Sequence, residues 1–453
     1  MDNLEKNSIH TVTIDNYDSA GNGIARIAGR VVFVRRAIAG ETCEVRILKC
    51  GKTAAWAKVE RILTPSPHRT APACPVFGKC GGCDLQHMDY SEELRYKKQR
   101  VDDALSRIGG IDVPAEEIIG AKEPERYRNK AVYTASCSSG VPEFGFFREH
   151  SHDVVPSEHC LIQTESSERA VAAAARWMKK HRVTAYDEKS GSGCVRRIFC
   201  RTASSGKMQI AVVTATKEIP ARDALVSELL SECPETTGII HNFNNARDNT
   251  VLAGEFRTIW GSDTLEDTLC GLTFSLSPRS FYQVNHAQAE ILYGKVLEFA
   301  DLKGNETVLD LYCGTGTITL FLARHARRVI GAELVEAAVL DARENARRNG
   351  ILNSEFICAD ASQAAEQFKA CALNPDVIVV DPPRKGLTPE VIAAAADMMP
   401  CRIIYVSCDP ATLARDLRLF GEKGYVTRRV TAVDMFPRTA HVETVVLMSR
   451  VEE

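Results

Sequence analysis

The chain has 453 residues and a net charge of −3 at neutral pH, which at roughly 100–200 residues per domain leaves room for two to four domains. Hydrophobic residues make up 45% of it, but no apolar run approaches the ~18 residues of a membrane-spanning helix, and the polar N-terminus lacks a signal-peptide core. These properties exclude a membrane protein and predict a cytoplasmic one. Because the molecule as a whole is not basic, any contact with nucleic acid must come from local basic patches.

The first part of the chain alternates β-type segments such as HTVTID, RVVFVRRA and ETCEVRIL with glycine-rich turns. This alternation predicts a small antiparallel barrel in an N-terminal domain of residues 1–64, and such barrels often bind nucleic acid. The stretch TPSPHRTAPACP predicts a linker, because its spaced prolines resist regular structure. Helical and strand patterns are mixed in the central domain that follows, residues 65–262.

Sixteen cysteines without a secretory signal argue against a disulfide framework and for reduced thiols. Cys74, Cys80 and Cys83 form a C-x5-C-x2-C pattern whose Gly-Gly lets the backbone fold closely around an inorganic centre. A fourth ligand is needed, and Cys160 in SEHCLI is the best candidate. Three clustered thiolates and a distant one favour a four-iron (4Fe–4S) cluster over structural zinc, which more often shows two paired C-x2-C units. A zinc site and chance spacing stay open as alternatives.

The pattern changes in the last domain, residues 263–453, to strands that each lead into a helix. The strand segments after residue 305 include TVLDLYCG, RVIGAEL, EFICAD, DVIVVDPP and RIIYVSCD. This order predicts an α/β fold with a doubly wound, mostly parallel sheet. Ligands of such sheets bind outside the carboxyl ends of the strands, so the residues at those ends are the candidates for chemistry.

The segment LDLYCGTGTITL combines a strand, a glycine turn and a helix start, and Glu333 closes the next strand, where it would meet the hydroxyl pair of a ribose. A nicotinamide-binding pattern would have a third glycine near Thr319, and its absence disfavours a dehydrogenase. S-adenosyl-L-methionine, which has no pyrophosphate, is favoured instead. Asp360 is then expected near the adenine and Asp381 near the reacting end of the cofactor.

The segment DPPR and the cysteine after the next strand narrow the chemistry. Methyltransferases that act on amino groups of bases have an aromatic residue where this chain has Arg384, so amine methylation is disfavoured. A thiolate of Cys408 that adds to carbon 6 of uracil would make carbon 5 nucleophilic enough to take a methyl group. Glu443 in HVE could then remove the carbon 5 proton. A structural thiol at Cys408 and an ordinary surface acid at Glu443 are the alternatives.

Together these motifs resemble the RNA uracil-5 methyltransferase family over essentially the whole chain, most closely its bacterial 23S ribosomal RNA branch. The resemblance implies a Rossmann-like methyltransferase domain, an N-terminal barrel of the OB or TRAM type and a central α+β iron–sulfur domain. It also implies that S-adenosyl-L-methionine and a 4Fe–4S cluster are the cofactors.

The resemblance carries roles over to individual residues. SCDP matches the family's nucleophile motif at Cys408, and HVE matches its base at Glu443. The implied cluster ligands are Cys74, Cys80, Cys83 and Cys160. The implied cofactor contacts are Gln283, Tyr312, Thr317, Glu333, Asp360 and Asp381, although many members have asparagine at the position of Thr317. Segments 126–130 and 145–155 are expected to face RNA, with the target base flipped out of its stack.

The substrate follows from the domain content that the resemblance implies. Members that modify transfer RNA usually lack both barrel and cluster, so a uridine of 23S ribosomal RNA is expected, with transfer RNA as the second candidate. We expect a monomer. A non-catalytic RNA-binding relative would lose Cys408, Glu443 or the glycine turn, and all three are present. A radical enzyme would leave one cluster iron free, and Cys160 as a fourth ligand argues against that.

Overall fold

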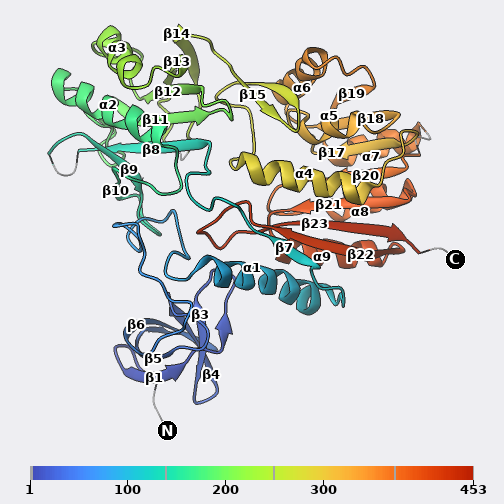
Figure 1. Ribbon diagram of the computed structural model, residues 1–453, viewed down its shortest axis with the longest axis horizontal. Helices are drawn as coiled ribbons and strands as arrows, with labels where there is room; N and C mark the ends of the chain where they lie inside the picture. Colours follow the sequence, from blue (N-terminus) through green and yellow to red (C-terminus); the bar gives the residue numbers. More distant parts are fainter. Residues whose placement is uncertain (1–3, 138–139, 248–249, 372–373, 452–453) are drawn as a thin grey trace.

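The computed structural model describes residues 4–137, 140–247, 250–371 and 374–451. Its first unit, at the blue end of the chain in Figure 1, is a six-stranded sheet that curls into a small barrel, in the order β1-β5-β6-β4-β3-β2. Alternate residues face its core, as in β4, where Val32 and Val34 are buried and Arg35 is exposed. The strands are β1 (Ile9–Thr13), β2 (Asn16–Tyr17), β3 (Gly23–Ile27), β4 (Arg30–Arg35), β5 (Thr42–Cys50) and β6 (Ala54–Thr64).

The barrel departs from the predicted antiparallel pattern at one strand pair. β4 and β6 pair in parallel, with Val32 opposite Ala55. The chain reverses twice between them, because β5 pairs antiparallel with β6, and β6 therefore returns beside β4 in the same direction. The alternation of apolar residues predicts which side chains are buried but says nothing of the order in which strands pair.

The central unit is a seven-stranded sheet in the order β10-β9-β8-β11-β12-β13-β14. The alanine-rich helix α2 (Glu165–His181) packs Ala170, Ala174 and Trp177 into the core over this sheet, together with α3 (Arg222–Glu232). The strands are β8 (Lys130–Ser136), β9 (Glu143–Phe147), β10 (Val154–Pro156), β11 (Val195–Thr202), β12 (Met208–Thr214), β13 (Thr236–Phe243) and β14 (Glu255–Gly261).

The third sheet has eight strands in the order β19-β18-β17-β20-β21-β23-β22-β7. The first five run parallel, and β23 is antiparallel to both of its neighbours. The hairpin of β15 (Leu265–Leu269) and β16 (Leu272–Leu276) precedes it in the chain. The strands are β17 (Thr307–Leu311), β18 (Arg328–Glu333), β19 (Ser354–Cys358), β20 (Val377–Val380), β21 (Arg402–Ser407), β22 (Tyr425–Val433) and β23 (Glu443–Arg450).

Helices cover both faces of this sheet, which confirms the predicted doubly wound α/β fold. In β20, Ile378 and Val380 belong to one hydrophobic core, whereas Val377 and Val379 belong to the core on the other face. Burial on both faces explains why these strands are continuous apolar runs. The helices are α4 (His286–Ala300), α5 (Thr317–Ala323), α6 (Glu336–Arg348), α7 (Ala361–Ala370), α8 (Pro389–Asp397) and α9 (Pro410–Gly421).

A segment that the sequence assigned to the central domain packs on the third sheet instead. α1 (Tyr90–Ala104) buries Val101 and Ala104 in the core on one face of that sheet, and after the π-helical turn η1 (Leu105–Gly109) the strand β7 (Glu117–Ile119) pairs with β22 at its edge. Figure 1 shows α1 between the barrel and the strands β22 and β23. In the described ranges, none of the helices is long and apolar enough to cross a membrane.

Candidate active site

A cavity of about 620 Å³ opens at the carboxyl ends of the parallel strands, where β17 and β20 lie side by side and the order of the strands reverses. Its size is in the range of sites for small molecules and cofactors. Every catalytic and cofactor-binding residue predicted from the sequence lines this cavity: Gln283, Tyr312, Thr317, Glu333, Asp360, Asp381, Cys408 and Glu443.

The glycine turn after β17 shapes one end of the cavity. Tyr312 and Gly316 adopt positive φ angles of 72° and 83°, and a Cβ atom at Gly316 would lie 3.1 Å from side-chain atoms of Ala342 and Phe356. Glu333 is held by two backbone amides, accepting hydrogen bonds from Gly314 N at 3.1 Å and Val335 N at 2.9 Å. The carboxylate therefore has a defined position at the end of β18, with lone pairs left for a ligand.

Thr317 begins α5, and its Oγ1 lies 3.0 Å from the hydroxyl of Tyr293. The hydroxyl of Thr317 therefore already has a partner inside the protein. A contact from this hydroxyl to a cofactor would be made in addition to the one with Tyr293.

Asp310 is a buried carboxylate of this cavity that the sequence analysis missed. Its Oδ2 accepts a hydrogen bond of 2.5 Å from Thr319 Oγ1, but Oδ1 has no hydrogen-bond partner within the described residues. Burial raises the pKa of Asp310 to about 7, and burial likewise raises the pKa of Asp381 to about 7. An acid inside the apolar strand LDLYCG was the available signal, since a charge there is costly unless it has a function.

Strand pairing brings Cys408 and Glu443 to the same edge of the sheet. Ser407, the last residue of β21, pairs with Thr444 of β23, so the two candidate residues continue the register on facing strands. After Cys408, Asp409 caps α9 by accepting hydrogen bonds from Ala411 N and Thr412 N, each 3.0 Å long. The side chain of Glu443, only 4% exposed, lines the cavity with Cys408.

The environment keeps both groups protonated in the free protein. Burial, followed by the charges of Glu443 and Asp381, raises the pKa of Cys408 to about 11. Burial and Asp381 raise the pKa of Glu443 to about 8. The positive charge of Arg384 acts in the opposite direction on the pKa of each group. Glu443 can therefore gain and lose a proton near neutrality, whereas Cys408 stays a thiol until the substrate is bound.

Two aromatic side chains and a histidine also line the cavity. Phe281 is 66% exposed, Phe436 packs edge-on against His441 with ring centroids 6.0 Å apart, and His441 Nε2 lies 3.4 Å from Arg384 Nη2. Burial and the charge of Arg384 lower the pKa of His441 to about 4, so its ring is neutral at physiological pH. These flat surfaces are suited to an unstacked base.

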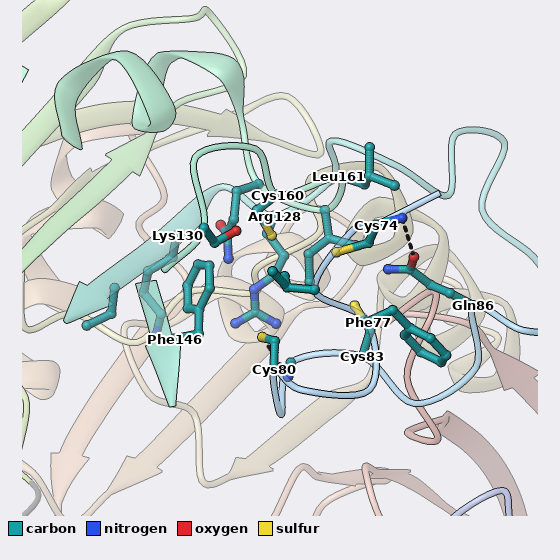
Figure 2. Close-up of a pocket in the computed structure, with 16 residues that line it drawn as sticks. Cys74, Phe77, Cys80, Cys83, Gln86, Arg128, Lys130, Phe146, Cys160 and Leu161 are labelled. Carbon is teal, nitrogen blue, oxygen red and sulfur yellow. Dashed lines mark hydrogen bonds between the residues drawn. The ribbon is translucent and has the colours of Figure 1, made fainter. Parts of the chain in front are cut away.

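The four predicted ligand cysteines lie together at a second cavity, of about 240 Å³. Figure 2 shows Cys74, Cys80, Cys83 and Cys160 around one space. Burial and the neighbouring thiols raise the pKa of Cys83 to about 12, and burial raises that of Cys160 to about 11. Across the described ranges, no group of three or more His, Cys, Asp or Glu side chains could hold a metal ion as placed.

The basic segment 126–130 is half-buried, and several of its side chains make contacts inside the protein. Arg126 donates to the carbonyls of Cys160 and Gln163 at 3.1 and 3.0 Å and contacts Glu168, and the Tyr127 hydroxyl donates to Pro437 O at 3.0 Å. Arg128 and Lys130 line the cysteine cavity (Figure 2), and burial lowers the pKa of Lys130 to about 8. The expectation that this segment faces RNA stays a prediction, and the polar groups of Arg126 and Tyr127 are bonded inside the protein.

Known proteins resemble both ends of the chain and the chain as a whole. The family model "tRNA (Uracil-5-)-methyltransferase" matches residues 263–451, and the TRAM domain model matches residues 4–59. An uncharacterized RNA methyltransferase of Clostridium tetani is 43% identical, covering 98% of this chain and 97% of its own. One from Bacillus cereus is 40% identical, with 99% and 98% coverage.

A solved structure shares the fold. The tRNA (uracil-54, C5)-methyltransferase of Pyrococcus abyssi, determined with S-adenosyl-L-homocysteine, has a TM-score of 0.77 at 24% identity and covers 97% of this chain and 100% of its own. The fold is therefore that of a Rossmann-like methyltransferase with an N-terminal barrel. With the relatives at 40% identity or more, the chain belongs to the S-adenosylmethionine-dependent RNA uracil-5 methyltransferase family.

Proposed function

We propose that this protein methylates carbon 5 of a uridine in 23S ribosomal RNA, with Cys408 as the nucleophile and Glu443 as the base. The observation that carries the proposal is the placement of these two side chains on facing ends of β21 and β23, in one cavity with Glu333 and Asp381. The proposed reaction needs only this one thiol and this one acid.

The residues around the glycine turn fit S-adenosyl-L-methionine, which supplies the methyl group on a sulfonium sulfur. Glu333 offers its remaining lone pairs to ribose hydroxyls, while the exposed side chains of Leu334 and Val335 provide an apolar surface for adenine. Asp310 Oδ1 and Asp381 offer acceptors for the amino group and the positively charged end.

The chain's own residues then carry out the covalent steps. Cys408 gives its proton to solvent water, its sulfur bonds to carbon 6 of the flipped uracil, and the electron pair of the double bond between carbons 5 and 6 moves onto carbon 5 and oxygen 4. Carbon 5 then takes the methyl group that S-adenosyl-L-methionine would supply from its sulfonium sulfur. Glu443 in its carboxylate form accepts the proton that remains on carbon 5, the bond between carbon 6 and sulfur breaks, and Cys408 leaves as a thiolate. Arg384 favours the thiolate form at the start and at the end.

An adduct experiment tests this proposal. RNA with 5-fluorouridine at the target should trap the protein as a denaturation-stable complex, because fluorine cannot be removed as a proton. Cys408→Ala should abolish the complex, and Cys401→Ala, which removes an exposed thiol at the other end of β21, should not. A complex that survives Cys408→Ala would refute the assignment.

The barrel supports a folded RNA as the substrate, and ribosomal RNA is proposed from the combination of the barrel with the four cysteines. It presents Trp56, 41% exposed, with Lys49 Nζ 5.4 Å from the ring centroid and Phe33 packed beside it. An exposed ring flanked by a cation is suited to stacking on unpaired bases, and gives a second RNA surface apart from the active site. Transfer RNA is the second candidate, because the family model and the Pyrococcus abyssi enzyme are both named for it. Mapping 5-methyluridine in cells with and without the gene decides between the two, and loss of the mark from transfer RNA alone would overturn the ribosomal substrate.

We also propose that the four cysteines hold a 4Fe–4S cluster. Zinc bound by thiolates at about 2.3 Å would need the sulfurs close together, whereas these thiols border a cavity large enough for a bigger centre. Arg128 and Lys130 at its wall would offset the negative charge of four thiolates. Anaerobically purified protein should be brown with about four irons per chain. Colourless protein that contains zinc would contradict the cluster.

A further inference from the structure

The segment between β22 and β23, residues 434–442, has no regular structure, yet it carries Phe436 and His441 into the active-site cavity and leads directly to Glu443. We call it the catalytic strap. The buried backbone polar groups of an irregular segment need hydrogen-bond partners, and partners outside the segment fix its position.

Those partners come largely from α1 and the residues just before it. Lys97 Nζ donates to Phe436 O at 3.1 Å, Arg438 N donates to Glu93 Oε1 at 2.6 Å, and the amides of Asp84 and Leu85 both donate to Arg438 O. Arg438 has a φ of 71°, in the left-handed region, and the bonds on both sides of the residue oppose its return to an ordinary conformation.

Ala440 is held on both sides of its peptide backbone. Its N–H donates to Asp84 Oδ2 at 3.1 Å, and its carbonyl accepts a hydrogen bond of 2.5 Å from Arg100 Nη1. Arg100 Nη2 also lies 3.9 Å from Asp409 Oδ2, while the other carboxylate oxygen of Asp409 caps α9. The guanidinium of Arg100 thus contacts both the strap, which leads to Glu443, and Asp409, which follows Cys408.

We propose that Arg100 is a positioning residue that sets the distance between Cys408 and Glu443. Its planar fork can serve the carbonyl of Ala440 and the carboxylate of Asp409 together, which a single ammonium group cannot do with the same geometry. Arg100 lies on α1, outside the active-site cavity, and acts through the backbone of Ala440 and the side chain of Asp409. The inference rests on the roles proposed for Cys408 and Glu443.

Arg100→Met in the full-length protein tests the proposal against Arg107→Met, which removes a cation of η1 that pairs with Asp103 at 3.2 Å and is 70% exposed. Arg100→Met should lower kcat for RNA methylation on the order of ten- to a hundredfold, because small displacements of reacting groups carry penalties of that size. KM for S-adenosylmethionine should stay within about twofold, since Glu333 and the glycine turn are untouched. Arg100→Lys should recover only part of kcat.

Hydrogen–deuterium exchange of the peptides covering residues 434–443 gives a readout independent of activity. Exchange should be faster in Arg100→Met than in wild type and unchanged in Arg107→Met. The positioning role is wrong if the wild-type protein methylates RNA and Arg100→Met either keeps the wild-type kcat or differs from wild type only in KM. If the wild-type protein proves inactive on RNA, the proposed function fails. If the hydrogen–deuterium exchange of residues 434–443 is the same in Arg100→Met as in wild type, the contact between α1 and the strap does not hold the strap in place.

Discussion

Lys97 offers the sharpest test of how α1 is joined to the catalytic strap. Its ammonium group is completely buried and lies 2.7 Å from Glu93 Oε1 and 2.6 Å from Asp434 Oδ1, whose side chains are buried as well. Lys97→Met keeps most of the volume of the side chain but leaves two buried carboxylates without their shared cation. Removal of one partner from a buried ion pair costs about 3–5 kcal/mol, because the remaining charge stays desolvated.

That loss should be visible in thermal unfolding. At about 2–4 °C per kcal/mol for a unit of this size, the melting temperature of the domain that contains α1 should fall by roughly 10 °C. Lys98→Met is the matched control: the neighbouring lysine pairs with Asp102 at 2.8 Å, but both side chains are about one-third exposed, so its loss should cost less than about 1 kcal/mol. Differential scanning calorimetry measures both variants.

The dependence of this deficit on pH has a defined sign. Burial raises the pKa of Glu93 even with Lys97 present, and removing Lys97 would raise it further. When the pKa of a carboxyl group is higher in the folded than in the unfolded state, the free energy of unfolding of the protein falls as the pH rises through the folded-state pKa. The deficit of Lys97→Met should therefore grow with pH and shrink in acid. A Lys97→Met protein that melts like Lys98→Met at neutral pH would refute this account of the strap.

Three further outcomes are expected. Glu443→Gln should accumulate the covalent RNA adduct and slow its release, as quenched-flow assays would show. In wild type the release rate should rise with pH through about 8, where Glu443 ionises. A Glu443→Gln adduct that resolves at the wild-type rate would exclude the base role. Glu333→Ala should weaken S-adenosylmethionine binding about tenfold or more in calorimetry, while the exposed Glu336→Ala should not, and equal affinities would argue against the ribose contact. Gly316→Ala should lower the free energy of unfolding by about 1–3 kcal/mol more than Gly350→Ala does. Both glycines have a positive φ, but only Gly316 lies against Ala342 and Phe356. Equal melting temperatures of the two variants would count against that close approach.

The local patterns of the chain were sufficient for its elements and for most of the candidate site. Apolar runs that end in Glu333, Asp381 and Cys408 predict buried strands, and the topology of doubly wound sheets places the ends of such strands together whatever the rest of the fold. The structure brings all of these residues to one cavity. Asp310 was missed although an acid inside an apolar strand was a signal, and its complete burial became evident only in the assembled sheet.

The sequence by itself determined what depends on neighbours along the chain: the strands and helices, the glycine turn, the cysteine spacing and the family to which the motifs belong. Only the tertiary structure decided what depends on distant contacts. It placed α1 and β7 on the third sheet, bonded Arg126 and Tyr127 to distant backbone carbonyls, and joined Arg100 to Ala440, some 340 residues further along. Hydrogen bonds and ion pairs between remote segments leave no periodicity in the sequence, because each residue meets its partner only after the core has brought the two segments together.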